Sequence, residues 1–253
     1  MHSSSVGSII IDSTKLDTIF WKHLDTTYEC DSFIGEKISE RIKSVQERPI
    51  LLLLSGGSSF AVLDFIHTDN WKNITITMID ERFEKENTHN NFSQLERTDW
   101  YTHTKKNGAT FLSTKIQPAD TQEIMAHRWE NSIKSWQKEN LNGTLIALFG
   151  IGADGHTAGI FSYPQDQKLF ENLFLGNRLI VSYDASGKNE FPSRVTTTHT
   201  FHRLISYAYI SLKGEEKQQM LQRLIQHKAL LHELPAEIFS SLPNVTIGTT
   251  LNL

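Results

Sequence analysis

The sequence LIALFGIGADGHTAGIF at residues 145–161 carries the strongest indication of the architecture. Its first five residues, Leu145–Phe149, are apolar and rich in strand formers, which predicts a buried strand. Glycines follow at once, and Thr157–Phe161 is expected to begin a helix. Because open α/β sheets bind ligands at the carboxyl ends of their strands, Asp154 and His156 are predicted to lie at a ligand site. An acid and an imidazole in one tight turn indicate chemistry rather than packing.

Two other interpretations of this glycine turn are open. The turn is compatible with an ordinary tight connection in which His156 is only a surface residue. Gly150, Gly152 and Gly155 also match G-x-G-x-x-G, the fingerprint of dinucleotide sites. Asp154 argues against a dinucleotide, because a carboxylate in the turn would repel the pyrophosphate from the helix N-terminus that must hold it.

The composition excludes several classes of protein. The chain has 253 residues, 38% of them hydrophobic, which is enough for a sizeable core. Its 25 basic and 29 acidic residues give a net charge of −4, so we expect no nucleic-acid or membrane partner. Cys30 is the only cysteine, which agrees with a reducing compartment. With no signal-peptide pattern and no apolar run near the ~20 residues of a membrane span, we expect a cytoplasmic monomer or weak homo-oligomer.

Strands and helices are predicted to alternate along the chain. Ile50–Leu54 is apolar at every position, as in a parallel strand that is covered on both faces. From Asp31 to Glu47 apolar residues recur at helical spacing, with Asp31 or Ser32 as the cap. The alternation predicts one Rossmann-like α/β domain over residues 1–253, with a mostly parallel sheet and helices on both faces. Further predicted strands are 9–11, 74–79, 179–183 and 207–212, and further predicted helices include residues 122–138, 201–205 and 220–225.

A glycine/serine loop follows the strand at 50–54. It consists of Ser55, Gly56, Gly57, Ser58 and Ser59, and residues 60–66 are expected to form the next helix. Glycines let the backbone approach a ligand, and free N–H groups at a helix N-terminus attract an anion. The loop matches neither the Walker A pattern nor the G-x-S-x-G nucleophile elbow. It predicts a phosphate cradle, with an ordinary flexible turn as the alternative.

Charged and metal-binding residue types occur at two other places. Asp80, Glu81 and Arg82 follow the predicted strand at 74–79, where the carboxyl-end rule favours a site. Residues 83–108 are polar, and we expect a long loop there that is able to cover the site. His199 and His202 have the spacing of a metal pair on one helix, but a third ligand is lacking. We therefore expect surface or core histidines and no metal site.

Together, these motifs resemble the 6-phosphogluconolactonase family, within the superfamily shared with glucosamine-6-phosphate deaminase. The resemblance covers roughly residues 30–240, and the ordered set of motifs is more specific than any one of them. It implies a Rossmann-like fold, no cofactor, and hydrolysis of 6-phosphoglucono-1,5-lactone in the pentose phosphate pathway. The motifs that carry it are Ser55–Ser59, Asp80–Arg82, the Gly150–His156 turn with Thr157 and Ala158, Pro192–Thr196, and Gly214–Lys217.

The resemblance also implies roles for single residues. The Ser55–Ser59 loop, Arg82 and Lys217 would hold the phosphate. Asp80, Asp154 and Arg194 would line the sugar-lactone site, and His156 would be the catalytic base. This chain departs from the family pattern at two places. Ser59-Phe60 stands where the family usually has Thr-Pro, and the segment after Arg82 lacks the usual prolines although Asn91 occupies the position of the family's Asn.

Two functions other than lactone hydrolysis are open. In the deaminase branch, the histidine of the glycine turn is followed five residues later by Glu, and here that position is Phe161. Phe161 can neither accept a proton nor orient an imidazole by hydrogen bonding. A non-catalytic sugar-phosphate-binding regulator would be expected to lose the acid–base residues. Asp80, Asp154 and His156 are all present, so a lactonase is favoured.

Overall fold

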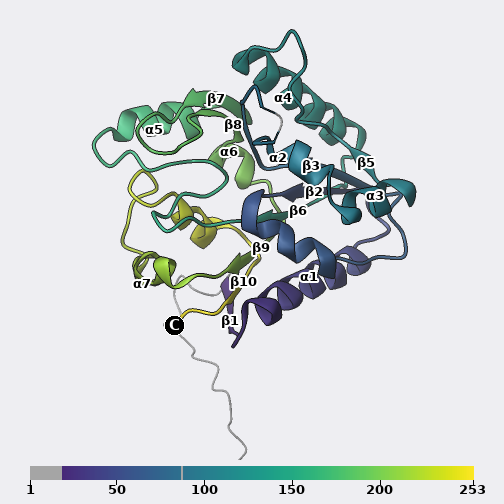
Figure 1. Cartoon of the computed structure of the whole chain (residues 1–253), viewed down its shortest axis with the longest axis horizontal. Coiled ribbons are helices and arrows are strands. Elements are labelled where there is room, and N and C mark those ends of the chain that lie inside the picture. The colour runs from purple at the N-terminus through teal and green to yellow at the C-terminus, as the bar shows by residue number, and fades with distance from the viewer. Residues whose placement is uncertain (1–18, 87) are drawn as a thin grey trace, which may run out of the picture.

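A mostly parallel sheet organises the chain (Figure 1). The computed structural model describes residues 19–86 and 88–253, so the strand expected at 9–11 lies outside the described residues. The neighbouring strands of the seven-stranded sheet all pair in parallel, which confirms the predicted α/β class. In spatial order they are β1 (Ile19–His23), β10 (Val245–Thr249), β9 (Tyr207–Leu212), β6 (Thr144–Phe149), β2 (Ile50–Leu54), β3 (Ile74–Met78) and β5 (Thr110–Phe111).

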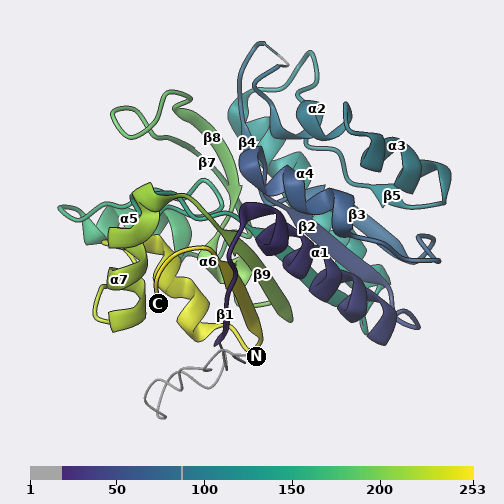
Figure 2. The same ribbon diagram turned by 60° about the horizontal axis from the view of Figure 1, so that its bottom comes forward.

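Helices cover both faces of this sheet (Figures 1 and 2). Strand β2 shows this directly, because Leu51 and Leu53 join one buried cluster and Leu52 and Leu54 join the other. No helix within the described ranges is long and apolar enough to cross a bilayer. The Leu52 face packs on α1 (Thr27–Ser44), the 3-10 helix η1 (Gly57–Phe65), α2 (Asn91–Leu95) and α3 (Asp99–Lys106). The Leu53 face packs on α4 (Gln122–Glu139), α6 (His199–His202), α7 (Gln218–Gln226) and the 3-10 helix η3 (Pro235–Ser241).

A second, antiparallel sheet lies beyond the end of β3. After Ile79 the chain enters β4 (Asp80–Arg82), which pairs with β8 (Ser193–Thr197), and β8 pairs with β7 (Ile180–Asp184). The register places Arg82 opposite Arg194 and Asp80 opposite Thr196. The strand expected at 179–183 is β7, but its pairing with β8 and the strand β4 were not predicted, since β4 is short and pairs with β8 across more than a hundred residues of sequence. It brings two arginines and one aspartate to the same place.

The helix expected at Thr157–Phe161 is wrong. The chain instead makes a compact turn closed by bridges from Thr157 to Ile151 and to Ile160, and the next helix, α5 (Gln167–Phe174), begins later. Ala158 and Gly159 have φ values of 50° and 63°, whereas an α-helix needs about −63°. The Thr157 hydroxyl donates to the carbonyl of Gly150 at 2.8 Å and so holds the turn together.

The long loop expected at 83–108 is also wrong for half of its length. Helices α2 and α3 occupy 91–95 and 99–106, and Trp100 and Tyr101 pack into the core. The reason is the buried Glu81 carboxylate, which accepts the N–H groups of Asn91 and Phe92 at 2.5 and 2.9 Å. A carboxylate at the first turn of a helix satisfies its free N–H groups. The helix α2 is therefore capped by a residue of the strand β4, and the local sequence of α2 cannot show this.

Two helix starts differ from the prediction. Helix α1 begins at Thr27, where the Thr26 hydroxyl and the Glu29 carboxylate form a capping box, so neither Asp31 nor Ser32 is the cap. Asp31 is buried and accepts from Lys213 Nζ at 2.5 and 2.6 Å. The helix expected at 60–66 is a 3-10 helix that begins at Gly57, inside the glycine/serine loop.

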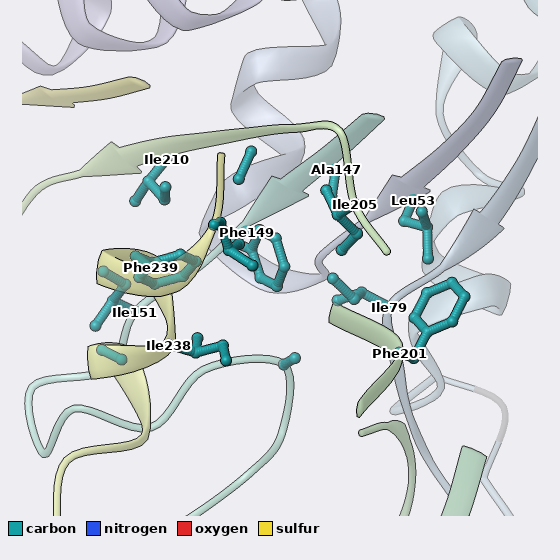
Figure 3. Packing of buried hydrophobic residues seen from close by; sticks show 14 of the residues in the cluster. Leu53, Ile79, Ala147, Phe149, Ile151, Phe201, Ile205, Ile210, Ile238 and Phe239 are labelled. Atoms are coloured by element: carbon teal, nitrogen blue, oxygen red, sulfur yellow. The ribbon is translucent and has the colours of Figure 1, made fainter. Parts of the chain in front are cut away.

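Residues at the start of the glycine turn pack in the buried cluster shown in Figure 3. Phe149, the last residue of β6, packs edge-to-face on Phe239 of η3, with 5.0 Å between ring centroids. Ile151 belongs to the same buried cluster, and the backbone N–H of Ala236 donates to the carbonyl of Gly155 at 3.0 Å. The turn is thus anchored to η3 by apolar packing and by a backbone hydrogen bond.

His199 and His202 are core residues, in line with one of the two expectations for them. The Thr197 hydroxyl donates to the carbonyl of Ile79 at 2.8 Å, so it accepts from His202 Nε2 at 2.8 Å. Burial lowers the pKa of both imidazoles and so favours their neutral forms. A neutral His202 with its hydrogen on Nε2 has none on Nδ1, which then accepts from His199 Nδ1–H at 3.2 Å. No cluster of three metal-ligating residues occurs in the part of the chain that the structure describes.

This pair should make the fold sensitive to acid. Burial lowers the pKa of His199 to about 3 and the pKa of His202 well below its ordinary value, whereas unfolding restores both. Below pH 6.5 the two histidines bind protons in the unfolded chain but remain neutral in the folded chain. The free energy of unfolding should therefore fall with falling pH, by about 1.4 kcal/mol per pH unit for each histidine.

Urea denaturation between pH 7 and pH 4.5 measures this dependence. The variant His199→Gln removes one titrating group and should show a shallower loss of stability than the unmodified protein. His127→Gln, at an exposed position on α4, should leave the slope unchanged. Equal slopes for His199→Gln and the unmodified chain would contradict the assignment.

Candidate active site

A cavity of about 300 Å³ opens where the neighbouring strands β9, β6, β2 and β3 end. All the site residues predicted from the sequence line it except Asp154. Those residues are Ser55, Gly56, Gly57, Ser58, Ser59, Asp80, Arg82, His156, Arg194 and Lys217. A larger hollow of about 970 Å³ lies along α4 and β5 and holds none of them. The carboxyl-end rule therefore located the cavity that gathers the reactive side chains.

The glycine/serine loop forms one wall of this cavity. Gly57 begins η1 with φ 64°, and no side chain caps the first turn of that helix. Gly57 and Ser58 are exposed, while Ser59 is buried. Gly56 lies against Asn91, since a Cβ atom there would be 2.2 Å from Asn91 Oδ1. The cavity is thus lined by a loop with serine hydroxyls and with no side-chain cap on the N–H groups of η1, which suits an anion.

Three cationic side chains surround the cavity. Arg82 donates to the carbonyl of His89 at 3.2 Å and lies over the ring of Phe191. Arg194 is only 4% exposed, and its Nη1 is 3.4 Å from the Asp80 carboxylate. Burial lowers the pKa of Lys217, which means that the ammonium is partly stripped of water. An anion bound beside these groups would offset that desolvation.

Asp154 stands behind His156 rather than in the cavity wall. Its Oδ1 accepts from the backbone N–H of His156 at 3.1 Å and lies 2.5 Å from His156 Nδ1. Burial alone would raise the pKa of Asp154, but the hydrogen bonds and charge of His156 outweigh it and lower that pKa. An ionised carboxylate only accepts, so the neutral imidazole carries its proton on Nδ1 and leaves Nε2 free to take another.

The glycines of the turn are needed for close approach of side chains. A Cβ atom on Gly152 would lie 2.1 Å from His156 Cε1, so the imidazole rests directly on that backbone. A Cβ atom on Gly159 would lie 2.7 Å from Asp80 Oδ2. Gly152, which belongs to the G-x-G-x-x-G spacing, therefore makes room for His156, and Gly159, which lies outside that spacing, makes room for Asp80.

The fold and these motifs match one family of proteins. The profile of the family described as glucosamine-6-phosphate isomerases/6-phosphogluconolactonase matches residues 26–247. The chain belongs to this family. A 6-phosphogluconolactonase of Xylella fastidiosa (strain 9a5c) is 28% identical over 238 residues, which is 91% of each chain.

Similar solved structures confirm the predicted fold. The 6-phosphogluconolactonase from Plasmodium vivax superposes with a TM-score of 0.76 at 15% identity, covering 96% of this chain and 93% of that one. The 6-phosphogluconolactonase from Shewanella baltica OS155 gives a TM-score of 0.72 at 20% identity, covering 92% of this chain and 99% of that one.

Further cavity-lining side chains of this family member were not predicted. Asn189 lies in the connection between β7 and β8, and Ser211 lies near the end of β9, where it donates to Asp31 at 2.7 Å. Phe161 packs on His156, with 4.6 Å between ring centroids, and its ring also lies under Arg194. Neither Asn189 nor Ser211 belongs to a short motif, so only the folded arrangement reveals their position.

Proposed function

We propose that this chain hydrolyses 6-phospho-D-glucono-1,5-lactone to 6-phosphogluconate, a step of the oxidative pentose phosphate pathway. The observation that carries the proposal is one cavity that joins an uncapped glycine/serine loop and three cations to the His156–Asp154 pair. The first set of groups suits a phosphate, and the second suits removal of a proton. The curated relative over 91% of the chain is named for the same activity, which supports the choice of substrate.

In this proposal the glycine/serine loop, Arg82 and Lys217 bind the phosphate. Hydrogen bonds to charged groups contribute roughly 1.5–3 kcal/mol each, and micromolar binding needs about 8 kcal/mol. Several backbone donors and two cations supply most of that. Asp80 and Arg194, which contact each other, bind oxygens of the sugar lactone. The reacting carbonyl is thereby held beside His156.

His156 acts as a general base in this mechanism. Its Nε2 takes a proton from a water molecule while the water oxygen forms a bond to C1 of the lactone. The bond between C1 and the ring oxygen then breaks, and the imidazolium returns its proton to that oxygen. Asp154 keeps the proton of the neutral imidazole on Nδ1 and stabilises the imidazolium. A lactone is an activated ester, so the reaction needs no covalent nucleophile.

The test of this function compares two substrates. Purified protein should hydrolyse freshly generated 6-phosphogluconolactone well above the spontaneous rate, and it should release no ammonia from glucosamine 6-phosphate. The apolar ring of Phe161 lies against the imidazole, at a position that resembles that of the deaminase glutamate, and it offers no acid or base. Ammonia release at a rate comparable to lactone hydrolysis would show the deaminase activity instead.

Removing either proposed phosphate cation should weaken substrate binding. We expect Arg82→Ala and Lys217→Ala each to raise KM by roughly 10-fold or more with a smaller change in kcat, because the ground state and the transition state share the phosphate contacts. Steady-state kinetics measure the two constants. Lys168→Ala, at an exposed position on α5, is the control for loss of a positive charge. An unchanged KM in both cavity variants would show that the phosphate binds elsewhere.

A further inference from the structure

The connection between β7 and β8, residues 185–192, extends from the small antiparallel sheet (Figure 2). One of its residues, Asn189, lines the cavity. The connection is closed at its base by the backbone N–H of Ala185, which donates to the carbonyl of Pro192 at 2.8 Å. Nearer its tip, Lys188 Nζ donates to the carbonyl of Ser162 at 2.7 Å and lies over the ring of Tyr163. The tip is therefore tied to the segment that follows the glycine turn.

The side chain of Asn189, at this tip, has a defined orientation. Its Oδ1 accepts from Arg194 Nη2 at 2.7 Å and from the backbone N–H of Phe191 at 3.0 Å. Rotating the amide by half a turn would set its NH₂ group against these two donors. Oδ1 is thus occupied by hydrogen bonds within the protein. Nδ2 is the atom that remains to bind a ligand in the cavity that Asn189 lines.

Arg194 adds to this arrangement. Its Nη1 and Nη2 are directed to Asp80 and Asn189, and its buried Nε has no hydrogen-bond partner among the residues that the structure describes. Both side chains line the same wall. That wall therefore offers N–H donors, which recognise acceptor oxygens such as those of hydroxyl, carbonyl or phosphate groups.

We propose that Asn189 is a substrate-binding residue, whose Nδ2 donates a hydrogen bond to an oxygen of the bound sugar phosphate beside Arg194. The proposal rests on the proposed function, since it concerns the same cavity. Asn189 then has two tasks: its oxygen orients the Arg194 guanidinium, and its nitrogen contacts the substrate. A variant that separates the two tasks is Asn189→Asp, because it keeps the acceptor oxygen and loses the NH₂ group.

A second substitution at the neighbouring residue offsets the negative charge that Asn189→Asp adds. Glu190 is exposed, so Glu190→Gln removes one negative charge at the same tip. The double variant Asn189→Asp/Glu190→Gln has the net charge of the unmodified protein but lacks the Asn189 donor. We expect Glu190→Gln alone to change KM for the lactone by less than about 2-fold, and the double variant to raise KM by about 3- to 10-fold, which is the loss of one hydrogen bond.

Inhibition by inorganic phosphate distinguishes the two sources of the acceptor oxygen. If the inhibition constant of phosphate rises with KM in the double variant, Nδ2 contacts the phosphate group. If only KM rises, Nδ2 contacts the sugar lactone. A double variant with the KM and kcat/KM of the unmodified protein overturns the proposal for Asn189. Failure of the proposed function is a separate result, since the unmodified protein would then not accelerate lactone hydrolysis.

Discussion

Replacing His156 by asparagine should lower kcat by about 10²–10⁴-fold, the contribution of a positioned general base. Asparagine keeps polarity and much of the imidazole's shape, so it still fits over the Gly152 backbone, but it takes up no proton from water. Substrate affinity should change little, because the residues proposed to bind the phosphate are other residues of the cavity. The effect is measured by steady-state hydrolysis of the lactone, with the spontaneous rate subtracted.

Two comparisons make this result specific. His127→Asn changes an exposed histidine on α4 and should leave kcat unchanged. The thermal stability of His156→Asn should remain near that of the unmodified chain, since the imidazole is partly exposed and its hydrogen bond with Asp154 is local. A folded His156→Asn variant with kcat within a few-fold of the unmodified value would remove His156 from the mechanism, and Asp80 would be the next candidate base.

Replacing Glu81 by alanine should have the largest effect on stability. The carboxylate is fully buried and accepts from the backbone N–H groups of Arg82, Asn91 and Phe92 and from the Thr114 hydroxyl, at 2.5–2.9 Å. Each buried donor left without an acceptor costs about 1–3 kcal/mol. Even with partial relaxation we expect a loss of roughly 4 kcal/mol or more, against a typical total of about 5–15 kcal/mol.

Urea denaturation at pH 8 tests this expectation. Burial raises the pKa of Glu81 to about 7, despite four hydrogen bonds that lower it, so the carboxylate is mostly ionised at pH 8. Glu81→Gln keeps one acceptor oxygen and should lose less stability than Glu81→Ala. If Glu81→Ala unfolds within about 1 kcal/mol of the unmodified protein, the donors around position 81 have other partners, and Glu81 does not hold α2 in place.

The glycine turn at 150–156 shows how local patterns predicted part of the candidate site. The apolar run of β6 and the glycines after it placed Asp154 and His156 at the end of a central strand, and the structure has them there. The same pattern failed to predict the path of the chain after Thr157. Positive φ at Ala158, a residue that favours helices, depends on the Thr157 contacts to Gly150 and Ile160, and propensity does not include these.

The segment after Arg82 illustrates a different limit. Its polar composition predicts a loop, yet α2 forms there because Glu81, on β4, satisfies the first N–H groups of the helix. The free energy for this helix comes from a tertiary contact and from burial of Trp100 and Tyr101 in the next helix. Single-residue propensities carry no information about the contact with Glu81 or about the burial of the two aromatic side chains.

The sequence by itself determined the parallel α/β core and most residues of the candidate site, because the necessary signals lie within a few neighbouring residues. Apolar runs predict strands that are covered on both faces. The carboxyl-end rule then predicts that the polar residues after those strands lie together at one ligand site. Only the tertiary structure decided how Arg194 reaches Asp80, 114 residues away in sequence, and that Asn189 joins them. Those contacts depend on antiparallel pairing of β4 with β8, whose register is set by packing of distant segments rather than by any local pattern.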